Sequence, residues 1–120
     1  MARDVDGYLL PVPRKNLSAC RRIAGKAGRI CREHGALEYR ECAGDDLHVK
    51  MGIGFPRRIQ LKRGETAIFP WVVFKSRAHR DRVNAKAMKD PRFTKRMGPK
   101  SMPFDSKRVI FGGFKVLVDA

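Results

Sequence analysis

The sequence lacks any long apolar run, and none approaches the ~18 residues that a membrane-spanning helix needs. Its first residues also lack the basic stretch and apolar segment of a secretory signal peptide. Cysteine is scarce: Cys20 and Cys31 lie on one predicted helix, roughly 16 Å apart, too far for a disulfide or a shared metal, and Cys42 is the third. We therefore expect a cytoplasmic protein with no membrane contact, in which the cysteines act as small core residues.

The sequence also lacks the motifs that hold metals, cofactors or activated nucleophiles. It contains no Cys-x-x-Cys, no His-Glu-x-x-His and no acidic loop with calcium spacing. The segment Gly52-Ile53-Gly54 is half of a dinucleotide fingerprint and does not open a predicted helix, and no Gly-x-Ser-x-Gly elbow occurs. We therefore expect neither a metal site nor a cofactor.

Acidic residues are few beside basic ones: 12 Asp and Glu against 27 Lys and Arg give a net charge of +15. Such a field attracts polyanions without determining the fold, so non-specific binding of nucleic acid is expected from charge alone. RNA-recognition domains, however, expose aromatic residues from a Lys/Arg-Gly-Phe-Gly/Ala-Phe pattern on their third strand. The third predicted strand here reads Ile-Phe-Pro-Trp-Val-Val-Phe (68–74), so that stacking platform is missing.

The 120 residues are enough for one domain, residues 1–120, and too few for two. An amphipathic helix is predicted from Asn16 or Ser18 to about His34, with basic residues opposite its apolar stripe. Gly35 is placed to end this helix in the left-handed conformation. The apolar stripe comprises Leu17, Cys20, Ile23, Ala24, Ala27, Ile30 and Cys31.

Four strands are predicted from alternating apolar residues, and a second helix lies between the last two. The strands are residues 5–12, 37–43, 66–75 and 108–118, with 55–61 expected to resume the second strand. The second helix covers 77–89, is capped by Ser76 and ends at Asp90-Pro91. A further short turn is expected around Phe93 and Met97.

Two positions inside the strands predict irregular backbone. Pro70 lies within the third strand, where it removes a hydrogen-bond donor, so we expect a bulge or a local break. Gly112-Gly113 lies within the last strand and indicates a bulge or a close backbone contact.

The order of elements predicts an α+β fold of ferredoxin-like βαββαβ type. Right-handed crossovers close it into a four-stranded antiparallel sheet with both helices on one face. The first and last strands are apolar on both faces. In an antiparallel sheet covered on one side, the other face is normally polar and exposed to water. We therefore expect a second copy of the chain to cover that face, which makes the protein a homodimer.

Candidate site residues gather where the first helix passes into the second strand. His34 and Glu38 can form a base and its orienting partner, with Tyr39 beside them. Trp71 and His79 are expected at the same end of the sheet, lining a pocket under the first helix, with the loop after the second strand as a lid. The alternatives are that His34 complements the helix dipole, Glu38 faces solvent, and both Trp71 and His79 pack in the core or in an interface.

Four segments resemble the uncharacterised bacterial YbaA-like family: residues 6–13, 32–39, 75–81 and 102–105. The likeness extends over nearly the whole chain. It implies a dimeric α/β barrel in which two ferredoxin-like sheets face one another. That superfamily includes cofactor-independent monooxygenases, muconolactone isomerases and haem-binding chlorite dismutases, whereas the YbaA-like family has no assigned activity to carry over.

The leading hypothesis is a dimer that binds a small molecule between each sheet and its own helices. By analogy with the superfamily it acts without a cofactor, in the manner of a monooxygenase or isomerase, although a shared fold is a weak argument for function. A module that binds RNA or another polyanion through basic helix faces is the first alternative. A structural or stress-associated dimer is the second.

Overall fold

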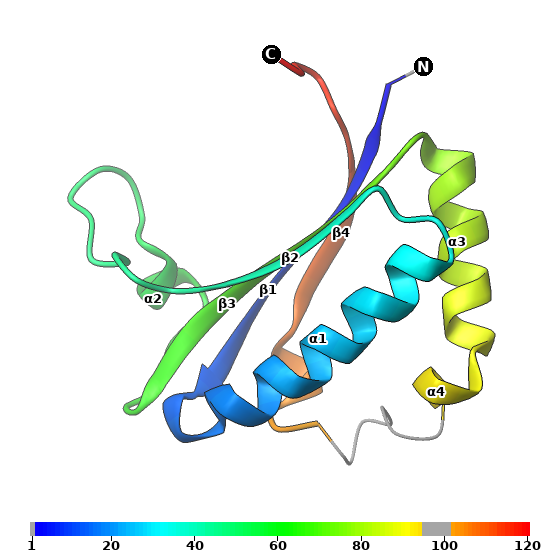
Figure 1. Cartoon of the computed structure of the whole chain (residues 1–120). Coiled ribbons are helices and arrows are strands. Elements are labelled where there is room, and N and C mark those ends of the chain that lie inside the picture. Colours follow the sequence, from blue (N-terminus) through cyan, green and yellow to red (C-terminus); the bar gives the residue numbers. More distant parts are fainter. Residues whose placement is uncertain (1, 95–101) are drawn as a thin grey trace.

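The predicted order of strands and helices is confirmed in the computed structural model, which describes residues 2–94 and 102–120 (Figure 1). The strands form one antiparallel sheet in the order β2-β3-β1-β4. No helix in this described part is long and apolar enough to cross a membrane. The main elements are β1 (Asp4–Pro13), α1 (Leu17–Glu33), β2 (Glu38–Ala43), β3 (Glu65–Phe74), α3 (Arg77–Lys89) and β4 (Ile110–Lys115). The short helical turns are η1 (Arg14–Asn16), α2 (Phe55–Arg58), α4 (Pro91–Thr94) and η3 (Ser106–Arg108).

The core lies between one face of the sheet and the helices α1 and α3 (Figure 1). Alternate residues of β1 and β3 point into it, because side chains of a strand alternate between the two faces. Ile30 of α1 and Val83 of α3 pack from the helix side and are almost fully buried. The strand residues of this core are Leu10, Val12, Ile68, Val72 and Phe74.

The helix termini follow the predicted signals. Gly35 ends α1 with a φ of 118°, and Ser76 caps α3 by accepting a hydrogen bond from the backbone nitrogen of His79 at 3.1 Å. Asn16 occupies the N-cap position of α1 without a side-chain cap; its side chain instead donates to the carbonyl oxygen of Pro103 at 2.8 Å. Asn16 therefore ties the start of α1 to the loop before β4.

The irregular positions are partly as expected. The register of β1 against β3 is the same on both sides of Pro70, so there is no bulge, but the pairing lapses opposite Phe69 and Pro70. The local break follows from the missing N–H of proline. β4 likewise keeps one register with β1, and Gly113 permits a close approach, because an added Cβ would collide with the guanidinium of Arg80.

Three expectations about the elements are wrong. Residues 55–61 do not resume β2; α2 forms there because Pro56 fits the first helical turn, where its missing N–H is not needed. β4 is shorter than residues 108–118, because the turn η3, capped by Asp105, precedes it, and because its pairing ends where Lys115 meets Asp4, the first residue of β1. Cys42 is exposed and not a core residue, although Cys20 and Cys31 are half-buried. Met97 lies outside the described residues.

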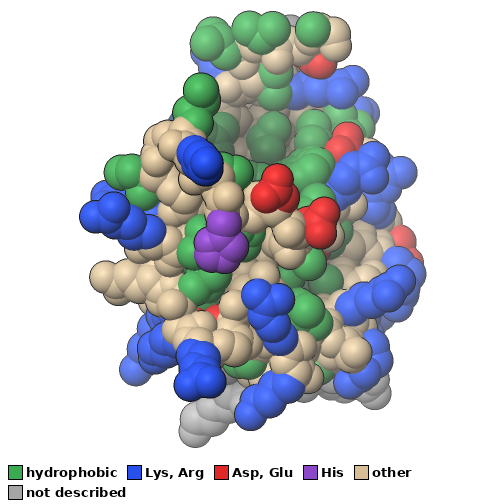
Figure 2. Space-filling model, turned by 90° about the vertical axis from the view of Figure 1, so that its left-hand side faces the viewer, with side chains coloured by type: hydrophobic (Ala, Val, Ile, Leu, Met, Phe, Trp, Pro, Cys, Tyr) green, Lys and Arg blue, Asp and Glu red, His purple; other side chains and the backbone are tan. Residues whose placement is uncertain are grey.

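Neither α1 nor α3 covers the second face of the sheet, and only the short helix α2 lies on that side within the described residues (Figure 1). The segment between β2 and β3 projects from this side. Figure 2 shows hydrophobic side chains gathered in a shallow depression of this face, with Lys and Arg along its edges. Phe69, Ile110 and Phe114 remain 42%, 52% and 62% exposed. We call these residues, together with Leu9 and Trp71, the open-face patch, because the strand register places all five on this face. The apolar second face predicted from the sequence is thus present.

Candidate functional site

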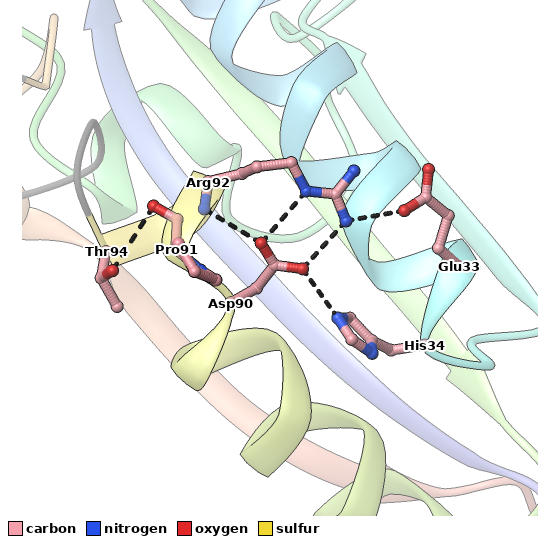
Figure 3. A network of polar contacts seen from close by, with 6 residues as sticks. All are labelled: Glu33, His34, Asp90, Pro91, Arg92 and Thr94. Atoms are coloured by element: carbon pink, nitrogen blue, oxygen red, sulfur yellow. Dashed lines mark hydrogen bonds and ion pairs between the residues drawn. The ribbon is translucent and has the colours of Figure 1, made fainter.

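His34 belongs to a polar network at the C-terminal end of α1 (Figure 3). Its Nε2 lies 2.9 Å from Oδ2 of Asp90, so the carboxylate beside this histidine is Asp90 and not the expected Glu38. Arg92 donates to both carboxylate oxygens of Asp90 and also binds Glu33 at 2.6 Å. These hydrogen bonds, from Arg92 first and His34 second, hold the pKa of Asp90 well below its usual range. The network joins α1 to the connection between α3 and α4.

Glu38 and Trp71 lie together on the other face of the sheet. The indole Nε1 of Trp71 donates to Oε1 of Glu38 at 3.0 Å, and Arg40 donates to the same oxygen at 3.0 Å. These two hydrogen bonds lower the pKa of Glu38, with that from Trp71 the larger cause. Trp71 also meets the ring of Phe69 edge to face, with centroids 6.0 Å apart. Trp71 thus belongs to the open-face patch and not to a pocket under α1.

His79 packs at the start of α3. Its Nδ1 accepts a hydrogen bond from the backbone nitrogen of Lys75 at 3.0 Å, and its ring meets Phe74 edge to face. Loss of solvation is the main cause that lowers the pKa of His79, and the charge of Lys75 adds to it. A neutral ring whose Nδ1 accepts from the chain is fixed in one tautomer. This geometry matches the alternative in which His79 is a packed residue.

The structure therefore separates the expected site residues. Glu38 and Tyr39 leave opposite faces of β2, because neighbouring strand residues alternate, but β2 is an edge strand and both residues line the cleft beside it. Tyr39 lies under α1, Glu38 and Trp71 lie on the open face, and His34 pairs with Asp90. Of the five expected residues, Glu38 and Tyr39 line one cleft, whereas His34, Trp71 and His79 do not line it, and the role of each residue toward a ligand stays a prediction.

A cleft does lie under α1, between that helix and the edge strand β2. Its volume is about 1060 Å³. A smaller inner cavity of about 270 Å³ continues between α1 and the sheet. Cleft and cavity lie side by side, because five residues line both: Cys20, Ala24, Tyr39, Glu41 and Ile68. We call the two together the hollow. The inner part is mostly apolar, with Leu10, Ile23 and Val72 among its walls.

Gly28 lets Tyr39 form the wall between the two parts. A Cβ at position 28 would lie 2.7 Å from Cδ1 of the Tyr39 ring, closer than side-chain atoms approach. Glycine inside a helix costs about 1 kcal/mol relative to alanine. Gly28 therefore lowers the stability of α1, but its missing side chain lets the Tyr39 ring pack directly against the helix.

Glu41 stands at the junction of cleft and cavity and was not expected as a site residue. Its Oε2 accepts a hydrogen bond from the Tyr39 hydroxyl at 2.5 Å. Although the residue as a whole keeps exposed surface, burial of its carboxyl raises the pKa of Glu41, and the bond from Tyr39 opposes this only in part. Burial and the charge of Glu41 raise the pKa of Tyr39, which stays a neutral donor. A carboxyl with a raised pKa at a cavity wall can accept or deliver a proton.

The inner cavity contacts a second group of polar residues on β1 and α3. Asn84 lines the cavity and donates to Oδ2 of Asp6 at 2.9 Å, and Arg80 lies 3.4 Å from Oδ1 of Asp6. Asp4 is buried beside them, 3.6 Å from Arg80. Burial first, and the charge of Asp6 second, raise the pKa of Tyr8 in the cavity to about 12. Asp6 is thus held by its neighbours, and the group orients Asn84 toward the cavity.

The other potential reactive groups are less suited to chemistry. Burial raises the pKa of the Cys31 thiol in the inner cavity and that of Cys20 at its junction with the cleft, which disfavours a nucleophilic thiolate. Within residues 2–94 and 102–120, no three His, Cys, Asp or Glu side chains gather as metal ligands would.

Comparisons with known proteins agree with the fold. A family model described as a protein of unknown function (DUF1428) matches residues 3–106. YbaA of Escherichia coli (strain K12), an uncharacterised protein, is 38% identical over 115 residues, which are 96% of this chain and 97% of the relative. YbaA of Shigella flexneri matches with the same figures.

A solved structure gives an independent view of the fold. The crystal structure of a dimeric ferredoxin-like protein from an uncultured marine organism superimposes with a TM-score of 0.63 at 10% identity, with both chains covered in full. The predicted ferredoxin-like α+β fold and the resemblance to YbaA are thereby confirmed. The chain belongs to the DUF1428 family of proteins of unknown function.

Proposed function

We propose that this protein is a homodimer that binds a small molecule in the hollow under α1, where Glu41 transfers a proton without help from a cofactor. The observation that carries the proposal is the carboxyl of Glu41, bound by Tyr39 at the point where cleft and cavity meet. A largely apolar hollow with a few converging polar groups and a perturbed pKa is the usual form of a small-molecule site. Isomerisation of a substrate with an acidic C–H group, or its oxygenation with molecular oxygen as the co-substrate, fits this arrangement better than hydrolysis, which needs an activated nucleophile or water.

Ligand binding can be tested with a neutral probe, naphthalene-2-carboxamide, by isothermal titration calorimetry. Ala24 lines both parts of the hollow, so Ala24→Phe places a ring inside it. We expect the wild type to bind the carboxamide and Ala24→Phe to lose at least tenfold in affinity. Ala78→Phe is the control, because Ala78 is exposed on α3, outside the hollow. Circular dichroism checks that both variants fold. The absence of wild-type binding, or equal binding by all three proteins, would refute the proposed site.

The proton-transfer role can be tested without a ligand. The Glu41 carboxyl carbon is followed by NMR as a function of pH, with Glu41→Gln used to assign its signal. We expect a pKa above the ordinary value for glutamate, because burial disfavours the charged form. Tyr39→Phe should raise this pKa further, because the Tyr39 hydroxyl donates to the carboxylate and stabilises it. An ordinary or lowered pKa in the wild type would contradict the role.

The open-face patch supports the homodimer. Phe69, Ile110 and Phe114 together expose an apolar surface on the face of the sheet that α1 and α3 leave uncovered. Such surface on a small protein marks an interface, and the fold neighbour is described as dimeric. A second copy presents the same patch, so a twofold axis covers both sheets at once.

Light scattering tests this association. We expect a mass twice that of the 13.6 kDa chain at micromolar concentration. Phe114→Glu should give a monomer, because a dimer would bury the new charge. Met88→Glu introduces the same charge at an exposed apolar residue of α3 and should stay dimeric. A wild-type monomer, or identical behaviour of the two variants, would contradict the interface.

A further inference from the structure

We propose that the ligand of the hollow carries an oxyanion, a carboxylate or a phosphate, on its apolar body. The body lies in the inner cavity, and the oxyanion lies at the mouth of the cleft, against Arg21, Arg29 and Arg32 of α1. This inference rests on the proposed function and adds the chemical class of the ligand to it.

The first observation is that these three arginines form one edge of the mouth. Positions 21, 29 and 32 lie on the same side of the helix, and all three line the cleft. In the part of the chain that the structure describes, none of them forms an ion pair with a carboxylate. Arg32 donates to the carbonyl oxygens of Ala36 and Leu37, which are neutral acceptors. Its charge therefore remains uncompensated.

The second observation is that the carboxylates at the same mouth already have partners. Glu33 binds Arg92 at 2.6 Å, Glu38 binds Arg40 at 3.0 Å, and Glu41 accepts from Tyr39. Three guanidinium groups without a carboxylate partner thus line a cleft in which Glu33, Glu38 and Glu41 already bind other side chains. Charge-assisted bonds to a planar or tetrahedral oxyanion are what guanidinium groups make best.

The third observation concerns the helix backbone between the arginines. Gly25 lies one turn after Arg21 and one turn before Arg29, and it lines the cleft. The guanidinium Nη1 of Arg29 lies 3.8 Å from where a Cβ of Gly25 would be, so this arginine lies along the helix at the mouth. Among the residues that the structure describes, no other side chain lies within 4 Å of that position, so packing does not account for glycine there, in contrast to Gly28. The bare backbone leaves room for a ligand group beside Arg29.

The test compares three probes of similar shape by calorimetry at 0.15 M salt: naphthalene-2-carboxylate, 2-naphthyl phosphate and the neutral naphthalene-2-carboxamide. We expect the wild type to bind at least one anion about fivefold or more tightly than the carboxamide, since exposed charge pairs contribute modestly at this ionic strength. Whichever anion binds more tightly identifies the oxyanion as a carboxylate or a phosphate. Arg21→Gln/Arg29→Gln should lower this preference clearly, because only Arg32 of the three arginines then remains at the mouth.

The control is Arg22→Gln/Lys26→Gln, which removes the same charge from α1 at residues that do not line the cleft. It should keep the preference. Equal binding of all three probes by the wild type, or equal loss of preference in both double variants, would overturn the oxyanion inference while leaving the proposed site intact. Failure of every probe to bind would overturn the proposed site, and the inference with it.

Discussion

Two glycines of α1 should respond in opposite directions to the same substitution. Gly28→Ala places a Cβ 2.7 Å from Cδ1 and 3.0 Å from Cε1 of the Tyr39 ring, so the ring must move. Gly25→Ala meets nothing closer than the flexible Arg29 side chain at 3.8 Å. The pair isolates the contact that shapes the wall of the hollow.

The magnitudes follow from two opposing contributions. Alanine stabilises a helix interior by about 1 kcal/mol relative to glycine, and this gain applies at both positions. Overpacking a well-filled contact costs about 1–3 kcal/mol, and this cost applies to Gly28→Ala alone. We therefore expect Gly25→Ala to raise the free energy of unfolding by up to about 1 kcal/mol, and Gly28→Ala to lower it by up to about 2 kcal/mol.

Urea denaturation followed by circular dichroism measures both variants at one protein concentration, because dimerisation makes apparent stability depend on concentration. In Gly28→Ala we also expect a changed pKa of Glu41, since a displaced Tyr39 loses its hydrogen bond to that carboxyl. Tyr39→Ala in the Gly28→Ala background should remove the overpacking cost. If both glycine variants are stabilised equally, the close contact between Gly28 and Tyr39 does not exist and the reasoning fails.

Further expectations concern stability, pH and salt. Val83→Ala should lower the free energy of unfolding by about 2 kcal/mol in urea denaturation, because Val83 is 1% exposed, whereas Met88→Ala at 61% exposure should change it by less than about 0.5 kcal/mol. Asp90→Asn should lower the melting temperature at neutral pH. Because the folded pKa of Asp90 lies well below the ordinary 3.8, this difference should begin to shrink as the pH falls below 3.8 and should be lost as the pH approaches the lower folded pKa; a constant difference would contradict it. The pKa of Tyr8 is raised to about 12, so wild-type stability should fall from pH 10 to 12 more steeply than that of Tyr8→Phe in alkaline unfolding curves. RNA binding in filter assays should fall roughly 10³-fold between about 50 and 200 mM salt, and tight binding of one RNA sequence at physiological salt would refute a purely non-specific attraction.

Local patterns in the sequence were sufficient for most of the fold. The stripe of α1, the left-handed Gly35 and the Ser76 cap each depend on residues within a few positions of one another, and each is confirmed. The segment from Phe55 was mistaken for a strand because its apolar pattern is too short to distinguish a strand from a helix. Pro56, which fits the first turn of a helix, was the stronger signal.

The expected site could not be assembled in this way, because its contacts depend on tertiary packing. His34 and Asp90 are 56 positions apart and meet only because α1 and α3 lie on the same face of the sheet. Sequence proximity made Glu38 seem the partner of His34, but the alternation of β2 turns Glu38 to the open face. Trp71 follows Glu38 to that face for the same reason.

The alternation of β2 nevertheless contained the signal for Glu41. The same pattern that sets Glu38 and Arg40 on one face sets Tyr39 and Glu41 on the other, and the helix stripe predicts which face is covered. A carboxylate on the covered face is less well solvated than one on the open face, so its pKa rises unless a cation lies beside it. Glu41 is such a residue: Tyr39 supplies a neutral donor and no cation, burial raises the pKa of the Glu41 carboxyl, and both parts of the hollow reach it. The feature of this sequence that indicates a proton-transfer site is therefore Glu41, a carboxylate at a strand position that alternation places on the helix-covered face, and not His34 at the end of α1.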